Sequence, residues 1–122
     1  MFHILVVDDD KNTRQLIKAV LETENYIVIG ATDGEDALKV LDRSHIDLVI
    51  LDVMMPKMDG YEFTEILRRV QNELPILMVS AKQLPADRNK GFIVGTDDFM
   101  TKPFDEEELL LRVKALLRRA KI

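Results

Sequence analysis

Acidic residues directly follow two apolar segments of the chain, and their type and spacing could support metal chemistry. Asp8–Asp10 follow Ile4–Val7, and Asp52 follows Leu48–Leu51. Like charges that lie close together raise one another's pKa or require a cation between them. Mg²⁺ prefers oxygen ligands, keeps several waters and suits two or three carboxylates beside a phosphate. These carboxylates therefore predict a Mg²⁺ site, provided that the fold brings the two segments together.

Two further residues supply groups that phosphate chemistry needs. Ser80 follows the apolar segment Ile76–Val79, and Lys102 follows Asp98–Thr101. A carboxylate such as Asp52 can attack phosphorus to form an aspartyl phosphate. Phosphoryl transfer also needs charge stabilisation on the transferring oxygens, which Mg²⁺, the Lys102 ammonium and the Ser80 hydroxyl with backbone N–H groups would provide. Singly, such residues are more often helix caps or loop residues, so the interpretation depends on their combination at four strand ends.

Five short apolar segments alternate with amphipathic stretches, and this order predicts the fold. Nearly continuous apolar runs are typical of strands that are covered on both faces. Strands that alternate with helices predict a doubly wound α/β sheet with right-handed crossovers. In such sheets the functional crevice lies beyond the carboxyl ends of the strands. The expected strands are Ile4–Val7, Tyr26–Ile29, Leu48–Leu51, Ile76–Val79 and the less apolar Asp98–Thr101.

The segments between the expected strands are predicted to be helices. Apolar residues recur there with the period of an amphipathic helix, for example Leu16 with Val20, and Phe63 with Val70. The fourth helix begins near Pro85, and a glycine inside it costs about 1 kcal/mol relative to alanine, so we expect a marginal and mobile helix. The expected helices are Lys11–Glu24, Gly34–Asp42, a third around Phe63–Val70, Ala86–Val94, and a last one around Leu109–Leu117.

Composition narrows the class of protein. A length of 122 residues fits one domain, and the absence of cysteine excludes disulfides and thiolate metal sites. The net charge of −5 argues against nucleic-acid binding by this domain. Met1–Ile4 lack the basic start of a signal peptide, and no apolar run reaches the ~20 residues of a membrane helix, so we expect a cytoplasmic location away from membranes. His3 and His45 have no sequence cluster that indicates catalysis or metal binding.

Four segments together resemble the receiver domains of bacterial two-component response regulators. They are Ile4–Asp10, Leu51–Gly60, Met78–Lys82 and Gly95–Phe104, and they occur in the order and spacing of that family. The resemblance covers the whole chain and implies one receiver domain over residues 1–122. It implies a flavodoxin-like (CheY-like) fold: a five-stranded parallel sheet in the order 2-1-3-4-5 with five helices.

The resemblance also implies the roles of the acidic residues. Asp52 would be the phosphoacceptor, and a sensor histidine kinase would be the donor and partner. Asp9 and Asp52 would be direct Mg²⁺ ligands, the backbone carbonyl of Met54 would be a third, and Asp8 would act through metal-bound water.

Further residues match the phosphoryl-contact and switch positions of the family. Lys102 would contact the phosphoryl group and precede a cis peptide bond to Pro103. Ser80 and Phe99 would form the switch pair, in which the hydroxyl moves towards the phosphoryl group and the ring moves inward. Ser80 stands where Thr is commoner and Phe99 where Tyr is frequent, so a switch that needs a phenol hydroxyl is absent.

The end of the chain resembles the OmpR/PhoB-type subfamily, whose members carry a winged-helix DNA-binding domain after the receiver. The resemblance implies the N-terminal part of a longer transcription regulator, ending where an interdomain linker would begin, after Leu117–Arg119. It also implies phosphorylation-dependent homodimers that form through the fourth helix, fifth strand and fifth helix. Oppositely charged residues match the pairing positions of that face: Arg88 with Glu108, Asp98 with Arg112, and Asp97 with Arg119.

Three alternatives stay open beside this interpretation. An Asp-nucleophile phosphatase or mutase would carry a second Asp two residues after the nucleophile, where this chain has Met54. A binding module that never accepts phosphate is disfavoured by the complete set of Asp9, Asp52 and Lys102. A stand-alone receiver is compatible with the chain length. We expect a phosphoacceptor that helps to catalyse its own phosphorylation and slow dephosphorylation, not a turnover enzyme.

Overall fold

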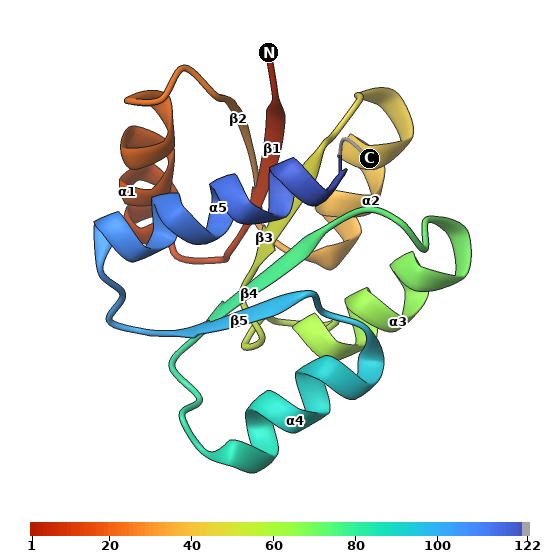
Figure 1. The fold of residues 1–122 in the computed structure, drawn as a ribbon. Coiled ribbons are helices and arrows are strands. Elements are labelled where there is room, and N and C mark those ends of the chain that lie inside the picture. Colours follow the sequence, from red (N-terminus) through yellow and green to blue (C-terminus); the bar gives the residue numbers. More distant parts are fainter. Residues whose placement is uncertain (121–122) are drawn as a thin grey trace.

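Five strands and five helices alternate along residues 1–120, which are the residues that the computed structural model describes (Figure 1). None of the helices in this range is long and apolar enough to cross a membrane. The strands are β1 His3–Val7, β2 Ile27–Ala31, β3 Leu48–Leu51, β4 Ile76–Ser80 and β5 Asp98–Thr101. The helices are α1 Lys11–Glu22, α2 Gly34–Arg43, α3 Gly60–Val70, α4 Pro85–Val94 and α5 Glu106–Ala120.

All strand pairs are parallel, and the sheet order is β2-β1-β3-β4-β5, which confirms the predicted topology. Helices α1 and α5 cover one face of the sheet, and α2, α3 and α4 cover the other (Figure 1). Alternate residues of a strand point to opposite faces, so Leu5 and Val7 join one core cluster while Ile4 and Val6 join the other. This arrangement explains why the strands read as continuous apolar runs.

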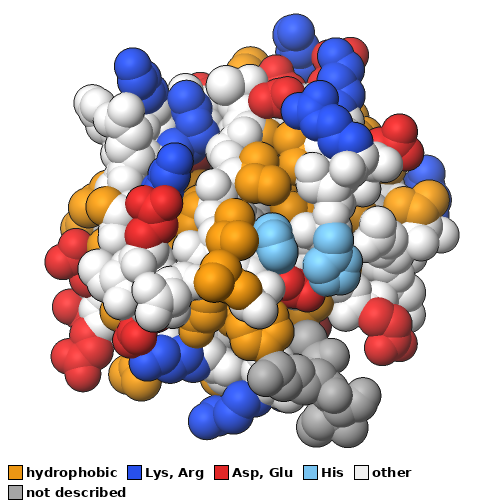
Figure 2. Space-filling view, turned by 90° about the horizontal axis from the view of Figure 1, so that it is seen from above, with side chains coloured by type: hydrophobic (Ala, Val, Ile, Leu, Met, Phe, Trp, Pro, Cys, Tyr) orange, Lys and Arg blue, Asp and Glu red, His pale blue; other side chains and the backbone are white. Residues whose placement is uncertain are grey.

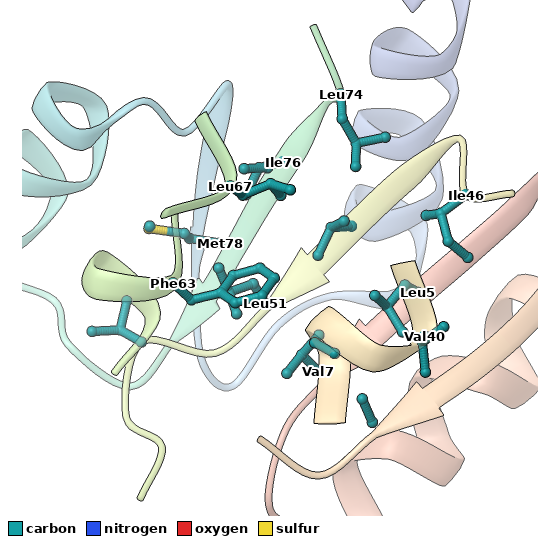
Figure 3. Packing of buried hydrophobic residues seen from close by; sticks show 14 of the residues in the cluster. Leu5, Val7, Val40, Ile46, Leu51, Phe63, Leu67, Leu74, Ile76 and Met78 are labelled. Carbon is teal, nitrogen blue, oxygen red and sulfur yellow. The ribbon is translucent and has the colours of Figure 1, made fainter. Parts of the chain in front are cut away.

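The core on the α2–α4 side is closed by apolar side chains of helix and sheet. Phe63 of α3 is fully buried and points towards the sheet beside Leu51 and Met78 (Figure 3). Leu67 lies one turn further along the same helix and is buried in the same cluster. These contacts seat α3 on the sheet, and α3 starts at the end of the loop that follows β3.

Some predicted ends of helices and strands, and two predicted buried positions on helices, were wrong. Helix α1 ends at Glu22, two residues early, because the N–H groups of the next three residues donate to carbonyls three residues back and Asn25 takes a left-handed conformation. The following strand begins at Ile27, so Tyr26 lies outside it. Leu16 and Val70, expected on buried stripes, are 48% and 73% exposed because they lie at the solvent edge of their helices.

The fourth helix shows why a glycine stands inside it. A Cβ atom built on Gly91 would lie 3.1 Å from Met78 Sδ and 3.2 Å from the Phe99 ring. The missing side chain therefore lets α4 approach β4 and β5 closely. The conformational cost of glycine in a helix is offset by this packing. The helix begins at Pro85, one residue earlier than predicted.

Gly60, the first residue of α3, fixes the loop after β3. Its N–H donates to the carbonyl of Val53 over 2.8 Å, and Asp59 caps the helix in a capping box with Glu62. A Cβ atom on Gly60 would lie 2.6 Å from the Asp52 carbonyl oxygen and 2.7 Å from Val53 Cα. Both neighbours are backbone atoms, so only glycine permits this approach.

We expect Gly60→Ala to destabilise the fold by about 1–3 kcal/mol, because the added methyl group must displace the backbone that carries Asp52. Gly30→Ala is the matched control, since a Cβ there meets only the Arg14 side chain at 3.6 Å. That variant should be stabilised by about 0.5–1 kcal/mol, the usual cost of a glycine in a strand. Urea unfolding midpoints would measure both. Equal midpoints for the two variants would contradict the backbone clash.

Candidate functional site

The carboxyl ends of the strands bring together acidic residues that are far apart in the sequence. Strands β1 and β3 pair with Val7 opposite Leu51, so the next residues, Asp8 and Asp52, lie side by side. The Asp52 N–H donates to the Val7 carbonyl over 3.0 Å and continues this pairing. With Asp9, each residue offers a carboxylate oxygen within 4.8 Å of the others. The structure thus forms the acidic cluster that the sequence predicted.

Lys102 reaches this cluster from the end of β5. Its ammonium donates to Asp8 Oδ2 over 2.8 Å and to Asp52 Oδ2 over 3.0 Å. Its backbone N–H donates to the Ser80 carbonyl over 2.8 Å, and the Lys102–Pro103 peptide bond is cis. Burial by itself would lower the pKa of Lys102, but the two carboxylates outweigh it and raise this pKa above its usual value. The side chain is therefore a fixed cation.

The Asp52 carboxyl is buried, with 7% of the residue exposed. Burial raises its pKa above the ordinary value, although the Met54 N–H and the Lys102 ammonium hydrogen-bond to it and act in the opposite direction. The Met54 N–H donates to Asp52 Oδ1 over 3.1 Å, while the Met54 side chain is exposed. Three carboxylates face one ammonium here, and this excess negative charge, carried by oxygen atoms, fits a hard divalent cation.

Asp8 is positioned by contacts that the sequence analysis did not identify. One oxygen, Oδ1, accepts the Asp10 N–H over 2.9 Å, and the Asp8 carbonyl accepts from Arg14 Nη1 over 2.6 Å. Asp10 itself caps α1 through its carboxylate. Arg14 lies on the first turn of α1. The helical period of α1 is the one sequence signal that could have placed its side chain near the end of β1. Asp9 remains exposed at the mouth of the cluster.

Ser80 and Phe99 lie on the neighbouring strands β4 and β5. Ser80 is fully buried and its Oγ accepts the Lys82 N–H over 3.2 Å. Phe99 is 3% exposed and packs under α4 beside Gly91. The Arg88 guanidinium lies 5.8 Å from the centre of the Phe99 ring, within the range of a cation–π contact. These contacts join Phe99 of β5 to the surface of α4.

Several charged residues on the face formed by α4, β5 and α5 have partners within the chain. Arg112 pairs with Asp98 at 2.8 Å and with Glu108 at 3.0 Å. Asp97 pairs with Arg68 of α3 at 2.8 Å, a partner that the sequence analysis did not identify.

Arg68 is mostly buried and holds several backbone carbonyls at the far ends of α3 and α4. Its Nε donates to the Gly95 carbonyl over 2.9 Å, and its Nη1 donates to the Leu74 carbonyl over 2.6 Å. The guanidinium thus satisfies a carbonyl group at the C-cap of α4 and another in the loop that follows α3.

The raised pKa of Asp52 predicts that its ionisation destabilises the fold. The unfolded carboxyl ionises near 3.8, and the folded one at higher pH, so the free energy of unfolding falls as pH rises through this interval. Asp52→Asn removes the ionisation and should stabilise the protein at pH 7, with little gain at pH 3.5. Urea unfolding in EDTA at both pH values would measure this. The exposed control Asp42→Asn should leave the stability nearly unchanged. An Asp52→Asn gain that is the same at both pH values would contradict the raised pKa of Asp52.

Known proteins match the chain over nearly its whole length. The family described as response regulator receiver domain matches residues 4–114. The alkaline phosphatase synthesis transcriptional regulatory protein PhoP of Bacillus subtilis is 48% identical over 119 residues, which are 98% of this chain and 50% of that protein. The transcriptional regulatory protein CpxR of Escherichia coli K12 is 46% identical over 98% of this chain and 51% of its own length. The chain spans about half the length of these curated relatives.

A solved structure agrees with the sequence matches. The receiver domain of the Francisella response regulator 1452 superposes with a TM-score of 0.92 at 35% identity, and the alignment covers 98% of both chains. The family match spans most of the chain, the relatives exceed 45% identity, and the solved structure has the same fold. The chain therefore belongs to the family of response regulator receiver domains.

Proposed function

We propose that the domain is a phosphorylation switch in which Asp52 accepts a phosphoryl group from a phosphohistidine of a sensor histidine kinase. The observation that carries the proposal is the Lys102 ammonium, which contacts both Asp8 and Asp52 inside a cluster of three carboxylates. This arrangement holds a nucleophile and a fixed cation in one crevice, as phosphoryl transfer to a carboxylate requires.

The residues present fit Mg²⁺ as the cofactor. Asp9, Asp52 and the Met54 carbonyl would hold the ion, and Asp8 would bind one of its waters. Their ligand atoms are hard oxygens, and Asp8, Asp9 and Asp52 place theirs within 4.8 Å of one another. When bound, the ion would neutralise charge on the transferring phosphoryl oxygens.

The protein groups then have distinct roles in the transfer. A bond forms between an Asp52 carboxylate oxygen and phosphorus while the phosphorus–nitrogen bond to the donor imidazole breaks. The Lys102 ammonium, which Asp8 holds in place, neutralises one phosphoryl oxygen. The Ser80 hydroxyl donates to another. No second Asp stands two residues after Asp52 to act as acid or base, which favours a switch over a phosphatase.

The response would travel from Ser80 to the surface of α4. If the Ser80 hydroxyl moves towards the phosphoryl group, the packing of Phe99 against Gly91 would change. The contact between the Phe99 ring and the Arg88 guanidinium would then change as well. Phosphorylation would shift the populations of two arrangements of this face rather than create a new one. Because Arg88 contacts the Phe99 ring, a movement of that ring would reach the surface at Arg88.

A changed face of α4, β5 and α5 would strengthen a homodimer. Ile93 on α4 and Leu111 on α5 are 83% and 60% exposed, and their burial would supply affinity. Charged residues would set the register by exchanging contacts inside the chain for contacts between copies. The pairs proposed between copies are Arg88 with Glu108, Asp98 with Arg112, and Asp97 with Arg119.

We further propose that the domain acts as part of a longer cytoplasmic transcription regulator. Two relatives with 46–48% identity are transcriptional regulatory proteins of about twice this length. DNA binding would belong to a separate domain of the winged-helix type, in agreement with the net charge of −5 of this one.

Incubation with acetyl phosphate and Mg²⁺ should add one phosphoryl group to the protein, measured by intact mass. Asp52→Asn and an EDTA sample should show no gain, because the acceptor or the cation is missing. Asp10→Asn is a matched control that keeps a helix cap at the same position and should still be phosphorylated. If acetyl phosphate, a phosphohistidine donor and the mimic beryllofluoride all failed, the phosphoacceptor function would be rejected in favour of a constitutive binding module.

Glu108→Arg should weaken the dimer formed with beryllofluoride and Mg²⁺. A twofold symmetric dimer contains each charged pair twice, so at up to about 1 kcal/mol per pair we expect the association constant to fall by up to roughly thirtyfold. Sedimentation velocity would measure it. Arg88→Glu with Glu108→Arg should restore association, and Glu107→Arg, an exposed neighbour on α5, should leave it unchanged. A loss that the double variant does not repair would exclude the Arg88–Glu108 pair.

A further inference from the structure

Both histidines of the chain lie at the amino ends of the strands, on the side of the sheet opposite the acidic cluster. Their side chains lie next to each other on the face shown in Figure 2, with ring centres 6.2 Å apart. The strand register explains the meeting: Ile4 pairs with Leu48, so the preceding residues, His3 and Asp47, lie side by side. No sequence pattern indicated a shared partner for the two histidines, and the structure places Asp47 beside both of them.

His3 and Asp47 are held to each other through the backbone. The His3 N–H donates to Asp47 Oδ2 over 2.8 Å, and the Asp47 N–H donates to the His3 carbonyl over 2.8 Å. These two bonds join segments that lie 44 residues apart. The Asp47 carboxylate is therefore held against the backbone of His3 in the folded protein.

The Nδ1 atom of His3 is buried and has no hydrogen-bond partner among the described residues. It lies 3.9 Å from Asp47 Oδ2, which is too far for a hydrogen bond. An unsatisfied buried polar atom is costly, and an ion or water that satisfies it is a usual explanation. Here the orphaned nitrogen lies near a carboxylate oxygen, which together are two ligand atoms of suitable chemistry for a cation.

His45 supplies a second imidazole at the same place. In the segment 45–47, Ile46 is buried in the core while His45 is exposed and Asp47 is half-buried, as the alternation of an extended chain predicts. His45 Nε2 lies 2.8 Å from Asp47 Oδ1, and the His45 side chain is 77% exposed. Because it is so exposed, its ring can turn towards His3 at the cost of this one contact.

We propose that His3, His45 and Asp47 form a binding site for a first-row divalent transition metal, with Zn²⁺ as the representative ion. Two imidazoles and one carboxylate are the ligand types that Zn²⁺ prefers, whereas Mg²⁺ prefers a shell of oxygens. His3 Nδ1 and Asp47 provide the fixed half of the site, and His45 closes it. Water completes the coordination on the exposed side.

This site is separate from the acidic cluster and stands independently of phosphorylation. Its ligands come from the start of β1 and from the loop before β3, at the amino ends of the strands. Since folding alone brings these ligands together, the metal binds the folded state and should raise the melting temperature. The chain contains no cysteine and no further histidine, so an imidazole-bound metal can only be bound here.

Zn²⁺ titration of the intact domain in excess Mg²⁺, which occupies the carboxylate cluster, tests the site. The imidazole ¹⁵N resonances report binding directly. We expect both histidines to shift together and saturate at one equivalent, with a rise in melting temperature. Unchanged imidazole resonances at millimolar Zn²⁺ would overturn the proposal, as would a shift of His45 alone.

Variants separate this site from unspecific binding. His45→Ala removes an exposed ligand without disturbing the core, and His3→Gln removes the orphaned nitrogen. Each should lower Zn²⁺ affinity by about tenfold or more, since even outer-shell partners of a metal contribute this much. Glu73→Gln, which removes an exposed carboxylate from the surface pocket that Asp47 also lines, is the matched control and should bind like the unmutated protein. Undiminished affinity in both histidine variants would refute the site.

Discussion

The contact of the Lys102 ammonium with Asp8 and Asp52 is the interaction on which the functional edge of the domain depends. It joins the ends of β1, β3 and β5, although β5 is two strands away from β3 in the sheet. Without a cation, the buried carboxylates would repel each other in a region of low dielectric constant. The ammonium relieves part of this repulsion and leaves negative charge for a second cation.

Close packing keeps these polar groups in place. Two apolar clusters, one on each face, hold the sheet, and Gly60 lets α3 start against the backbone of Asp52. Gly91 does the same for α4 against Phe99. In both places a methyl group would separate two elements, so each glycine serves as a spacer of minimal size. The positions of Asp52 and Phe99 thus depend on residues that carry no chemistry.

Charged residues on and around α4 are held by partners within the chain. Arg88 lies over Phe99, Arg112 pairs with Asp98 and Glu108, and Asp97 pairs with Arg68. The two Arg112 pairs are partly exposed and individually weak, so the proposed dimer could exchange them at small cost, whereas Asp97 is held by the mostly buried Arg68. Contacts of low energy suit the proposed switch, because a small change in free energy is enough to alter which of them form.

The sequence by itself determined the element order, the parallel topology and the acidic cluster, because each depends on local pattern. Apolar runs predicted the strands, and the predicted bounds of β3 and β5 agree with the structure at both ends. Because the strands are parallel, the polar residues that directly follow them had to meet at the carboxyl ends of the strands. Only the tertiary structure decided which loop atoms meet. The roles of Arg14 and Arg68, and the meeting of His3 with His45 and Asp47, depend on loop paths and side-chain rotamers. These result from packing between segments far apart in the chain, and no local periodicity encodes them.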